Sequence, residues 1–362
     1  MGKFRRIGTL LGSSALVLGT MTLGVSGSVI ASAPASAAAK FTGCVVLDTG
    51  GVNDKSFNQG AWSGAQAAAK ANSAISVKYL TSNSSADYTS NINTFINQKC
   101  GIIVTIGYLM GDATTAAAKA HPTQKFAIVD SGSTSKNMLG LGYRTDQGAF
   151  LGGYLAAASS STGKVATFGG LNIPPVTIYM DGFVAGVRYY NLLNAKHVKV
   201  LGWAPDAAGG KGTFANSFTD QTAGNTITTG FFSQGADIVF PVAGSVGLGS
   251  LAAAKTAGAG HKVLWVDFDA KATNASDVAA GWFLGTVLKG VGASVQNAIA
   301  SAASGKFKGG AYSGTLANNG TGFAFNSSST SAALKSKIAA VAKDITSGAV
   351  SVDPNSYPNT TN

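Results

Sequence analysis

Short apolar runs alternate with longer stretches of helical composition through the first half of the chain. Each run is continuously apolar and is bounded by polar or glycine-rich segments. Strands that are buried on both faces of a sheet have this pattern, so the alternation predicts a parallel sheet with helices covering both faces. The predicted strands of this first series are residues 44–48, 76–80, 101–107 and 125–130.

The same alternation restarts after a helical segment at 146–160. Its predicted strands are residues 164–170, 197–203, 236–242 and 261–267. Two such series predict an α/β protein with two doubly wound lobes, and one continuous sheet of eight or more strands is the alternative. Beyond them, the pattern predicts a helix at 281–303, loop and short strand at 304–330, a last helix at 331–347, and a loosely held tail.

The N-terminus has the layout of a secretory signal peptide. Lys3, Arg5 and Arg6 precede an apolar stretch, which ends in the small-residue run Ala35-Ser36-Ala37. This layout predicts export with removal of residues 1–37, and a membrane anchor is the competing interpretation. No later segment offers about 18 consecutive apolar residues, the length that a membrane-spanning helix needs.

The charge of the chain does not favour a nucleic-acid partner. The formal net charge is +11, and it falls to +8 without the three basic residues of the leader. However, only 11% of residues are charged, the lysines are scattered, and Arg144 and Arg188 are the only arginines after the leader. The sequence therefore lacks the basic stripe that would follow a phosphate backbone.

Two cysteines lie at the beginning of two predicted strands. Cys44 begins the run CVVLD, and Cys100 precedes the run GIIVTIG. If these runs are neighbouring parallel strands, the two side chains come within disulfide reach at the same edge of the sheet. Export favours a disulfide over two free thiols, and the residues before Cys44 do not resemble a lipoprotein attachment site.

Several carboxylates follow predicted strands. In doubly wound sheets the ligand lies beyond the carboxyl ends of the strands, where carboxylates can accept hydrogen bonds from sugar hydroxyls. An Asp at such a position is also a common helix N-cap, so each Asp has a purely structural interpretation. The aspartates at these strand ends are Asp48, Asp130, Asp267 and Asp269.

The turn DTGGVNDKSFNQGAW, residues 48–62, is the densest cluster of such features. It places Phe57 at the head of a helix, where its ring could stack on a flat base or serve as a hydrophobic staple. The turn contains neither GxGxxG nor GxxxxGK[ST], so it does not indicate a dinucleotide or P-loop site.

Signals for catalysis and for metal binding are weak. His121, His197 and His261 lie beside predicted strand starts or helix ends, opposite the edge where a site should form. The chain also lacks a GxSxG nucleophile elbow. We therefore expect a binding protein without a cofactor or metal rather than an enzyme.

The chain resembles the basic membrane protein family of ABC-transporter substrate-binding proteins. The resemblance spans almost the whole chain after the leader, in order and at similar spacing. The matching segments include DTGGVNDKSFNQGAWSG, INQKCGIIVTIGYLMGDAT, YRTDQGAFLGGYLAA, GGLNIPPVTIYMDGFVAGV, ADIVFPVAGSVGLG, WVDFD and VLKGV.

The resemblance implies a type I periplasmic-binding-protein fold, with two Rossmann-like lobes joined by three crossovers and a purine nucleoside bound between them. By position, Phe57 and Phe218 would sandwich the base. Ribose contacts would come from Asp48, Gly244, Asp267 and Lys289. Asn53, Met110 and Asp130 would line the same cleft.

The expected organisation is a first lobe of residues 38–144 and about 271–310, a second lobe of 145–270 and about 311–350, and a flexible tail of 351–362. The resemblance also implies a monomer at the outer face of the membrane that closes around its ligand and delivers it to an ABC permease. A sugar, a small signalling molecule, or a nucleoside sensor in place of a transporter component remain alternatives.

Overall fold

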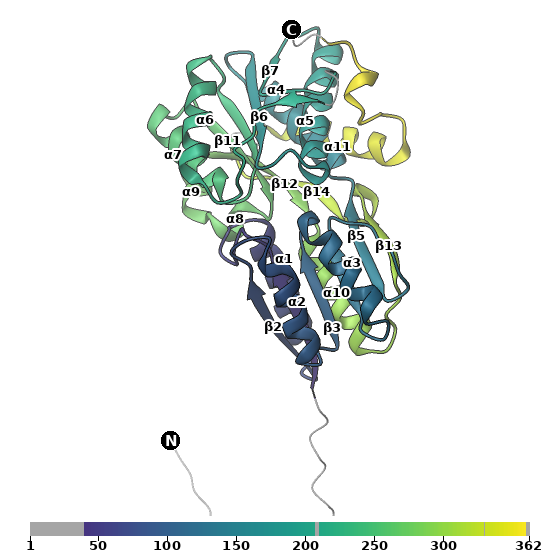
Figure 1. The fold of residues 1–362 in the computed structure, drawn as a ribbon. Coiled ribbons are helices and arrows are strands. Elements are labelled where there is room, and N and C mark those ends of the chain that lie inside the picture. The colour runs from purple at the N-terminus through teal and green to yellow at the C-terminus, as the bar shows by residue number, and fades with distance from the viewer. Residues whose placement is uncertain (1–39, 207–209, 329, 360–362) are drawn as a thin grey trace, which may run out of the picture. The chain divides into compact units, whose positions relative to one another are not determined.

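The described chain forms two α/β lobes, each built on its own six-stranded sheet (Figure 1). The structure is a computed structural model that describes residues 40–206, 210–328 and 330–359. The predicted signal segment 1–37 lies outside these residues. Two separate sheets confirm the two-lobed interpretation over a single continuous sheet.

The first lobe contains a fully parallel sheet with the strand order β13-β5-β4-β3-β1-β2. Side chains of β1, β3 and β4 are almost all buried, as their unbroken apolar sequences predict. The strands are β1 Phe41–Leu47, β2 Ile75–Thr81, β3 Ile102–Ile106, β4 Phe126–Val129, β5 Met138–Tyr143 and β13 Gly310–Gly314. The helices are α1 Phe57–Ala71, α2 Asp87–Asn97, α3 Gly111–Ala120 and α10 Val291–Ala303, with the 3₁₀ turn η1 Tyr108–Met110.

The second lobe contains a sheet with the order β14-β12-β11-β10-β6-β7, in which only β14 runs antiparallel to its neighbour. Its strands are β6 Lys164–Gly169, β7 Lys199–Leu201, β10 Ile238–Val242, β11 Lys262–Asp267, β12 Phe283–Lys289 and β14 Thr321–Phe325, with a small hairpin of β8 Trp203–Ala204 and β9 Lys211–Gly212. Its helices are α4 Thr145–Ser159, α5 Pro174–Asn194, α6 Gln221–Ser233, α7 Val246–Ala257, α8 Ala270–Thr273, α9 Ala275–Ala279 and α11 Ala332–Ser347, with the 3₁₀ turns η2 Leu316–Asn318 and η3 Pro354–Ser356.

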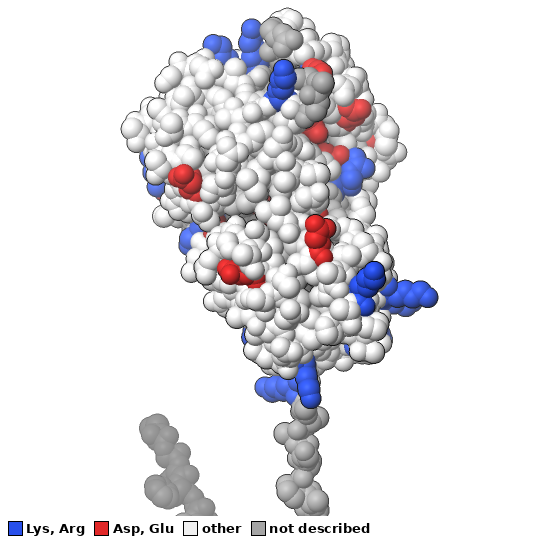
Figure 2. Space-filling view, viewed as in Figure 1, with Lys and Arg blue, Asp and Glu red and all other residues white. Residues whose placement is uncertain are grey.

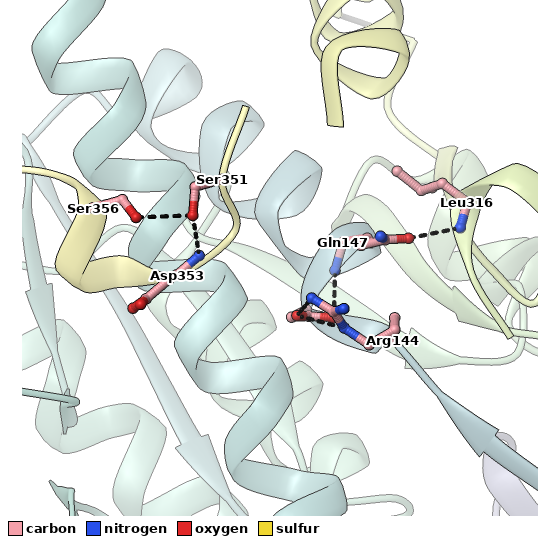
Figure 3. Close-up of polar contacts among 7 residues, drawn as sticks. Arg144, Gln147, Leu316, Ser351, Asp353 and Ser356 are labelled. Carbon is pink, nitrogen blue, oxygen red and sulfur yellow. Dashed lines mark hydrogen bonds and ion pairs between the residues drawn. The ribbon is translucent and has the colours of Figure 1, made fainter. Parts of the chain in front are cut away.

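The chain crosses between the lobes at Arg144, at Gly290 and along residues 315–320. The first and third crossovers are joined where the Gln147 side-chain oxygen accepts the Leu316 N–H at 2.8 Å (Figure 3). At the second crossover the Gly290 N–H donates to the Gly320 carbonyl. The three connections therefore form one hydrogen-bonded hinge.

The second crossover lies further along the chain than the sequence analysis predicts. Residues 283–289 form β12 in the second sheet rather than the start of a helix at 281–303, so the predicted lobe boundary near 271 is wrong. The later boundary moves as well, because residues 310–314 form β13 of the first sheet. The first error arises because a short apolar run such as FLGTVLK does not distinguish a buried strand from a buried helix.

Cys44 and Cys100 form a disulfide, as predicted from their positions. Cys44 lies in β1, which pairs with β3, and Cys100 directly precedes β3. Their Cα atoms are 6.0 Å apart, and both residues are buried in one hydrophobic cluster. The bridge closes a segment of the chain that includes β1, α1, β2 and α2, which limits the freedom of the unfolded state.

The segment after α11 is packed against the second lobe, so the prediction of a flexible tail is wrong for residues 351–359. The Arg188 guanidinium, 2% exposed, donates to both carboxylate oxygens of Asp206 and to the Pro354 carbonyl. The Tyr357 ring lies 5.4 Å from that of Tyr189. Hydrogen bonds from the Asp353 N–H and the Ser356 hydroxyl to the Ser351 Oγ shape the turn (Figure 3).

Charged side chains are sparse on the face of the protein shown in Figure 2, where lysines and aspartates are scattered among uncharged residues. Within the described residues, no helix combines the length and apolar character needed to cross a membrane.

Helix packing in the second lobe depends on glycine. A Cβ atom added at Gly186 of α5 would lie 2.0 Å from the Phe150 carbonyl oxygen of α4, and one at Gly153 would lie 2.0 Å from the Phe183 carbonyl oxygen. These contacts are with backbone, which cannot rotate away. We expect Gly186→Ala to lower the free energy of unfolding in urea by about 1–3 kcal/mol, the usual cost of overpacking.

Gly230 of α6 provides the matched control, because nothing lies within 4 Å of a Cβ atom added there. Gly230→Ala should leave stability unchanged or raise it by up to about 1 kcal/mol. Equal effects of the two substitutions would contradict this account of the α4–α5 contact.

The Arg188–Asp206 pair predicts a pH dependence of stability. Hydrogen bonds from Arg188 hold the pKa of the Asp206 carboxyl below its usual value of 3.8. A depressed pKa stabilises the folded state above the unfolded pKa, and this stabilisation is lost as the pH falls below about 4. Asp206→Asn should therefore destabilise the protein in urea unfolding at pH 5, and the difference from the parent chain should shrink below pH 4. A difference that is constant over this range would contradict the prediction.

Candidate functional site

The carboxyl ends of strands from both sheets surround a cleft between the lobes, with an empty volume of about 620 Å³ that includes the space at its open rim. Seven of the nine predicted site residues line it. Asp48, Phe57 and Asp130 come from the first lobe, and Phe218, Gly244, Asp267 and Lys289 come from the second. Both lobes therefore contribute side chains to the lining of the cleft.

Three of these residues lie at strand ends in the left-handed backbone region. The φ angles are 68° at Asp130 after β4, 67° at Asp267, the last residue of β11, and 57° at Gly244 after β10. This conformation costs a non-glycine residue roughly 1 kcal/mol, although Asp tolerates it better than most residues. Backbone strain of this kind is concentrated at functional sites.

An ion pair joins the lobes inside the cleft. The Lys289 Nζ lies 2.6 Å from the Asp130 carboxylate, and the two side chains are 4% and 8% exposed. The ammonium also lies 4.8 Å from the centre of the Phe57 ring and 5.3 Å from that of Tyr143. Removing one partner of such a pair would leave the other charge buried and uncompensated, so each fixes the position of the other.

A second carboxylate is held at the end of β1. Asp48 Oδ1 accepts hydrogen bonds from the Asn58 side-chain amide at 2.6 Å and from the Gly50 N–H at 2.9 Å. Burial raises the pKa of Asp48. The Asn58 side-chain oxygen is buried without a hydrogen-bond partner, although Asn58 lines the cleft. This oxygen is available to accept a hydrogen bond from a bound ligand.

Asp267, at the end of β11, is already hydrogen-bonded by its own surroundings. The Tyr179 hydroxyl donates to Asp267 Oδ1 at 2.6 Å, and the Ser56 hydroxyl lies 3.0 Å from Oδ2. Burial raises the pKa of Tyr179 well above its usual value, which keeps the phenol protonated as a donor. One carboxylate oxygen is thus bonded within the second lobe, and the other is bonded by Ser56 of the first lobe.

Asp54 lines the cleft but also anchors helix α1. Its carboxylate accepts the backbone N–H groups of Ser56, Asn58 and Gln59 at 2.8–3.0 Å. Burial nevertheless raises its pKa to about 7. Among the described residues that line the cleft, Lys289 is the one cation facing four aspartates, namely Asp48, Asp54, Asp130 and Asp267.

The remaining wall is apolar. Phe57 and Phe218 approach from opposite lobes, and Ile173, Pro175 and Val176 add aliphatic surface. Gly170 leaves space for Phe218, because a Cβ atom there would lie 2.3 Å from the ring. The 3₁₀ turn η1 places Tyr108 and Leu109 at the rim, 41% and 43% exposed.

Two predicted site residues lie elsewhere. Asn53 is exposed in the turn before α1 and does not line the cleft. Met110 ends η1 with its side chain fully buried in the hydrophobic core of the first lobe. Both follow from the local geometry, since the turn directs Asp54 inward, and η1 presents Tyr108 and Leu109 to the cleft.

The sequence analysis missed several lining residues. Asn58 directly follows Phe57 in the turn motif of residues 48–62. It also lies four residues after Asp54, whose carboxylate accepts its backbone N–H, and this spacing was the signal that could have identified it. Tyr179 lies within an apolar helix, where nothing in the sequence distinguishes it from a core aromatic. The described residues contain no group of three His, Cys, Asp or Glu side chains that could hold a metal ion.

The two Rossmann-like lobes, joined by three crossovers with a cleft between them, have the type I periplasmic-binding-protein fold. The model of the Bmp family, described as ABC transporter substrate-binding protein PnrA-like, matches residues 41–356. The chain therefore belongs to this family.

Relatives agree with this assignment, and a solved structure has the same fold. The chain is 31% identical over 325 residues to the ABC transporter nucleoside-binding protein BmpA of Lactococcus lactis, a match that covers 85% of this chain and 88% of that protein. It is also 31% identical to basic membrane protein A of Borreliella burgdorferi over 62% of each chain. A solute-binding protein of an ABC transporter system from Aeropyrum pernix has the same fold, with a TM-score of 0.75 at 24% identity, and the match covers 85% of this chain and 92% of that one.

The family assignment makes this chain the extracytoplasmic substrate-binding component of an ABC transporter. Its partners are a small-molecule ligand and a membrane permease.

Proposed function

We propose that the cleft binds a purine nucleoside and delivers it to the permease of an importer. The observation that carries this proposal is that two kinds of side chain line one cleft. Phe57 and Phe218 approach from opposite lobes, and Asp130, Asp267 and Lys289 add charged groups, with the Lys289 Nζ 4.8 Å from the centre of the Phe57 ring. A nucleoside likewise joins a flat base to a polyhydroxyl sugar.

Each kind of side chain suits one half of the ligand. Stacking of a base on an aromatic ring stabilises binding by about 1–3 kcal/mol. Buried carboxylates accept strong hydrogen bonds from ribose hydroxyls. The unpartnered oxygen of Asn58 can accept a hydrogen bond from a ligand amine or hydroxyl. The name of the Lactococcus relative, a nucleoside-binding protein, supports the same ligand class.

In the proposed mechanism, binding favours the closed arrangement of the lobes. A ligand that contacts both lobes stabilises the closed form over the open form by its differential affinity. In this mechanism the two sheets move as rigid bodies about the crossovers at Arg144, at Gly290 and along residues 315–320. The permease then recognises the closed shape.

The first test is calorimetric titration of the signal-free protein, stripped of co-purified ligand, with adenosine, guanosine, inosine, uridine, adenine, ribose and glucose. We expect saturable one-to-one binding of a purine nucleoside. Phe218→Ala should weaken it by roughly 10–100-fold through lost stacking. Asp267→Asn should also weaken it, because an amide is a poorer acceptor for ribose hydroxyls. Phe307→Ala, an aromatic truncation outside the cleft, should bind as the parent chain does.

Binding of glucose alone, or no binding across the panel by a demonstrably folded protein, would contradict the nucleoside proposal. The first of these outcomes would instead favour a sugar receptor. Binding without stimulation of uptake in vesicles that contain the permease would favour a sensor over a transport component.

The charge balance of the cleft predicts that phosphorylated ligands are rejected. Four aspartates face one lysine, and that lysine is already paired with Asp130. A phosphate group would enter a cleft whose only described lysine or arginine is already paired, so no free cation would compensate its charge. We expect adenosine 5′-monophosphate to bind at least about tenfold more weakly than adenosine in the same titration. Equal affinities would contradict this view of the cleft.

A further inference from the structure

We propose that a hydrogen-bonded contact outside the ligand cleft, centred on the Lys55 carbonyl, holds the two lobes together and thereby sets the ligand affinity. This interlobe contact consists of Lys55 and Ser56 from the first lobe and Trp265, Val266 and Thr273 from the second. None of these five residues lines the cleft.

The Lys55 carbonyl is the centre of the contact. It accepts hydrogen bonds from the Trp265 indole Nε1–H and from the Thr273 hydroxyl, both at 3.2 Å. Beside it, the Ser56 hydroxyl lies 3.0 Å from the Val266 carbonyl oxygen. All three interactions run from the turn before α1 to β11 and α8, and Figure 1 shows α8 facing the end of α1.

The turn is held in an unfavourable conformation at the residue that makes the contact. Lys55 has a φ of 61°, in the left-handed region that lysine rarely adopts. The family's ligand contacts do not account for this strain, because Lys55 does not line the cleft. The strained backbone instead directs its carbonyl toward the second lobe, where two donors meet it.

Burial of Trp265 explains why the contact favours the closed form. Trp265 is 0% exposed and packs against Phe283 in the core of the second lobe, so its indole N–H has a fixed position. When the lobes separate, this N–H loses the Lys55 carbonyl and must find water at the edge of a packed core. A buried donor without a partner is costly, so the contact favours the closed form even without ligand.

The contact should therefore determine how often the unliganded protein is closed. Apparent affinity falls in proportion to the fraction of molecules in the binding-competent form. Loss of the Thr273 or the Trp265 hydrogen bond should shift that fraction and weaken binding by roughly two- to tenfold, although neither residue lines the cleft.

The test uses Thr273→Val, which keeps the shape of the side chain and removes its hydroxyl donor. We expect the radius of gyration of the ligand-free variant, measured by small-angle X-ray scattering, to exceed that of the parent chain. At saturating adenosine the two should coincide, with a two- to tenfold higher Kd for the variant. Trp265→Phe is a second variant and should act in the same direction.

Thr256→Val is the matched control, because the Thr256 hydroxyl donates only to the Ala252 carbonyl of its own helix in the second lobe. It should change neither the radius of gyration nor the Kd. The inference is overturned if both Thr273→Val and Trp265→Phe match the parent chain in scattering and in affinity. It rests on the proposed function only for the choice of adenosine as probe, since the scattering of the ligand-free protein tests the contact even if adenosine does not bind.

Discussion

The ion pair between Lys289 and Asp130 is the interaction on which the arrangement of the site depends. Lys289 is the last residue of β12, and the chain crosses to the first lobe at the next residue, Gly290. Asp130 follows β4 of the first sheet. The pair therefore ties the end of one sheet to the end of the other beside the hinge. Because both charges are buried, neither can move away without an uncompensated cost.

Around this pair, the ends of the strands fix the polar side chains. Asp48, Asp130 and Asp267 all lie at the carboxyl ends of buried strands that have parallel neighbours, and these ends meet at the cleft. Parallel sheets place such residues together irrespective of their separation in sequence. The sequence therefore predicted these aspartates from the strand pattern alone, whereas Phe218 and Lys289 required the family resemblance. For Asp269, the alternative interpretation as a helix N-cap is correct, since its carboxylate caps α8.

The features that the sequence did not predict share a physical character. The strand β12 and a buried helix have the same apolar composition, so pattern could not separate them. Tyr179 acts through its hydroxyl, which an apolar helix does not reveal. The tail of 351–359 is polar and contains proline, as loose segments are, yet Arg188 and a cluster of aromatic rings hold it. Each error concerns a partner that is distant in sequence, which local pattern does not encode.

The polar groups of the cleft also explain why this site can be selective. Burial raises the pKa values of Asp48 and Asp130. The hydrogen bonds and charges that the protein offers to these carboxylates therefore do not fully offset the cost of removing their ionised forms from water. A ligand that donates hydrogen bonds to them relieves that cost, whereas an analogue without the donor leaves it in place. A site of this kind discriminates between ligands more strongly than an apolar pocket does, because the wrong ligand leaves buried polar groups without hydrogen-bond partners. Under the proposed function, the aromatic walls contribute affinity for flat rings in general, and the aspartates decide which ring-bearing molecule is retained.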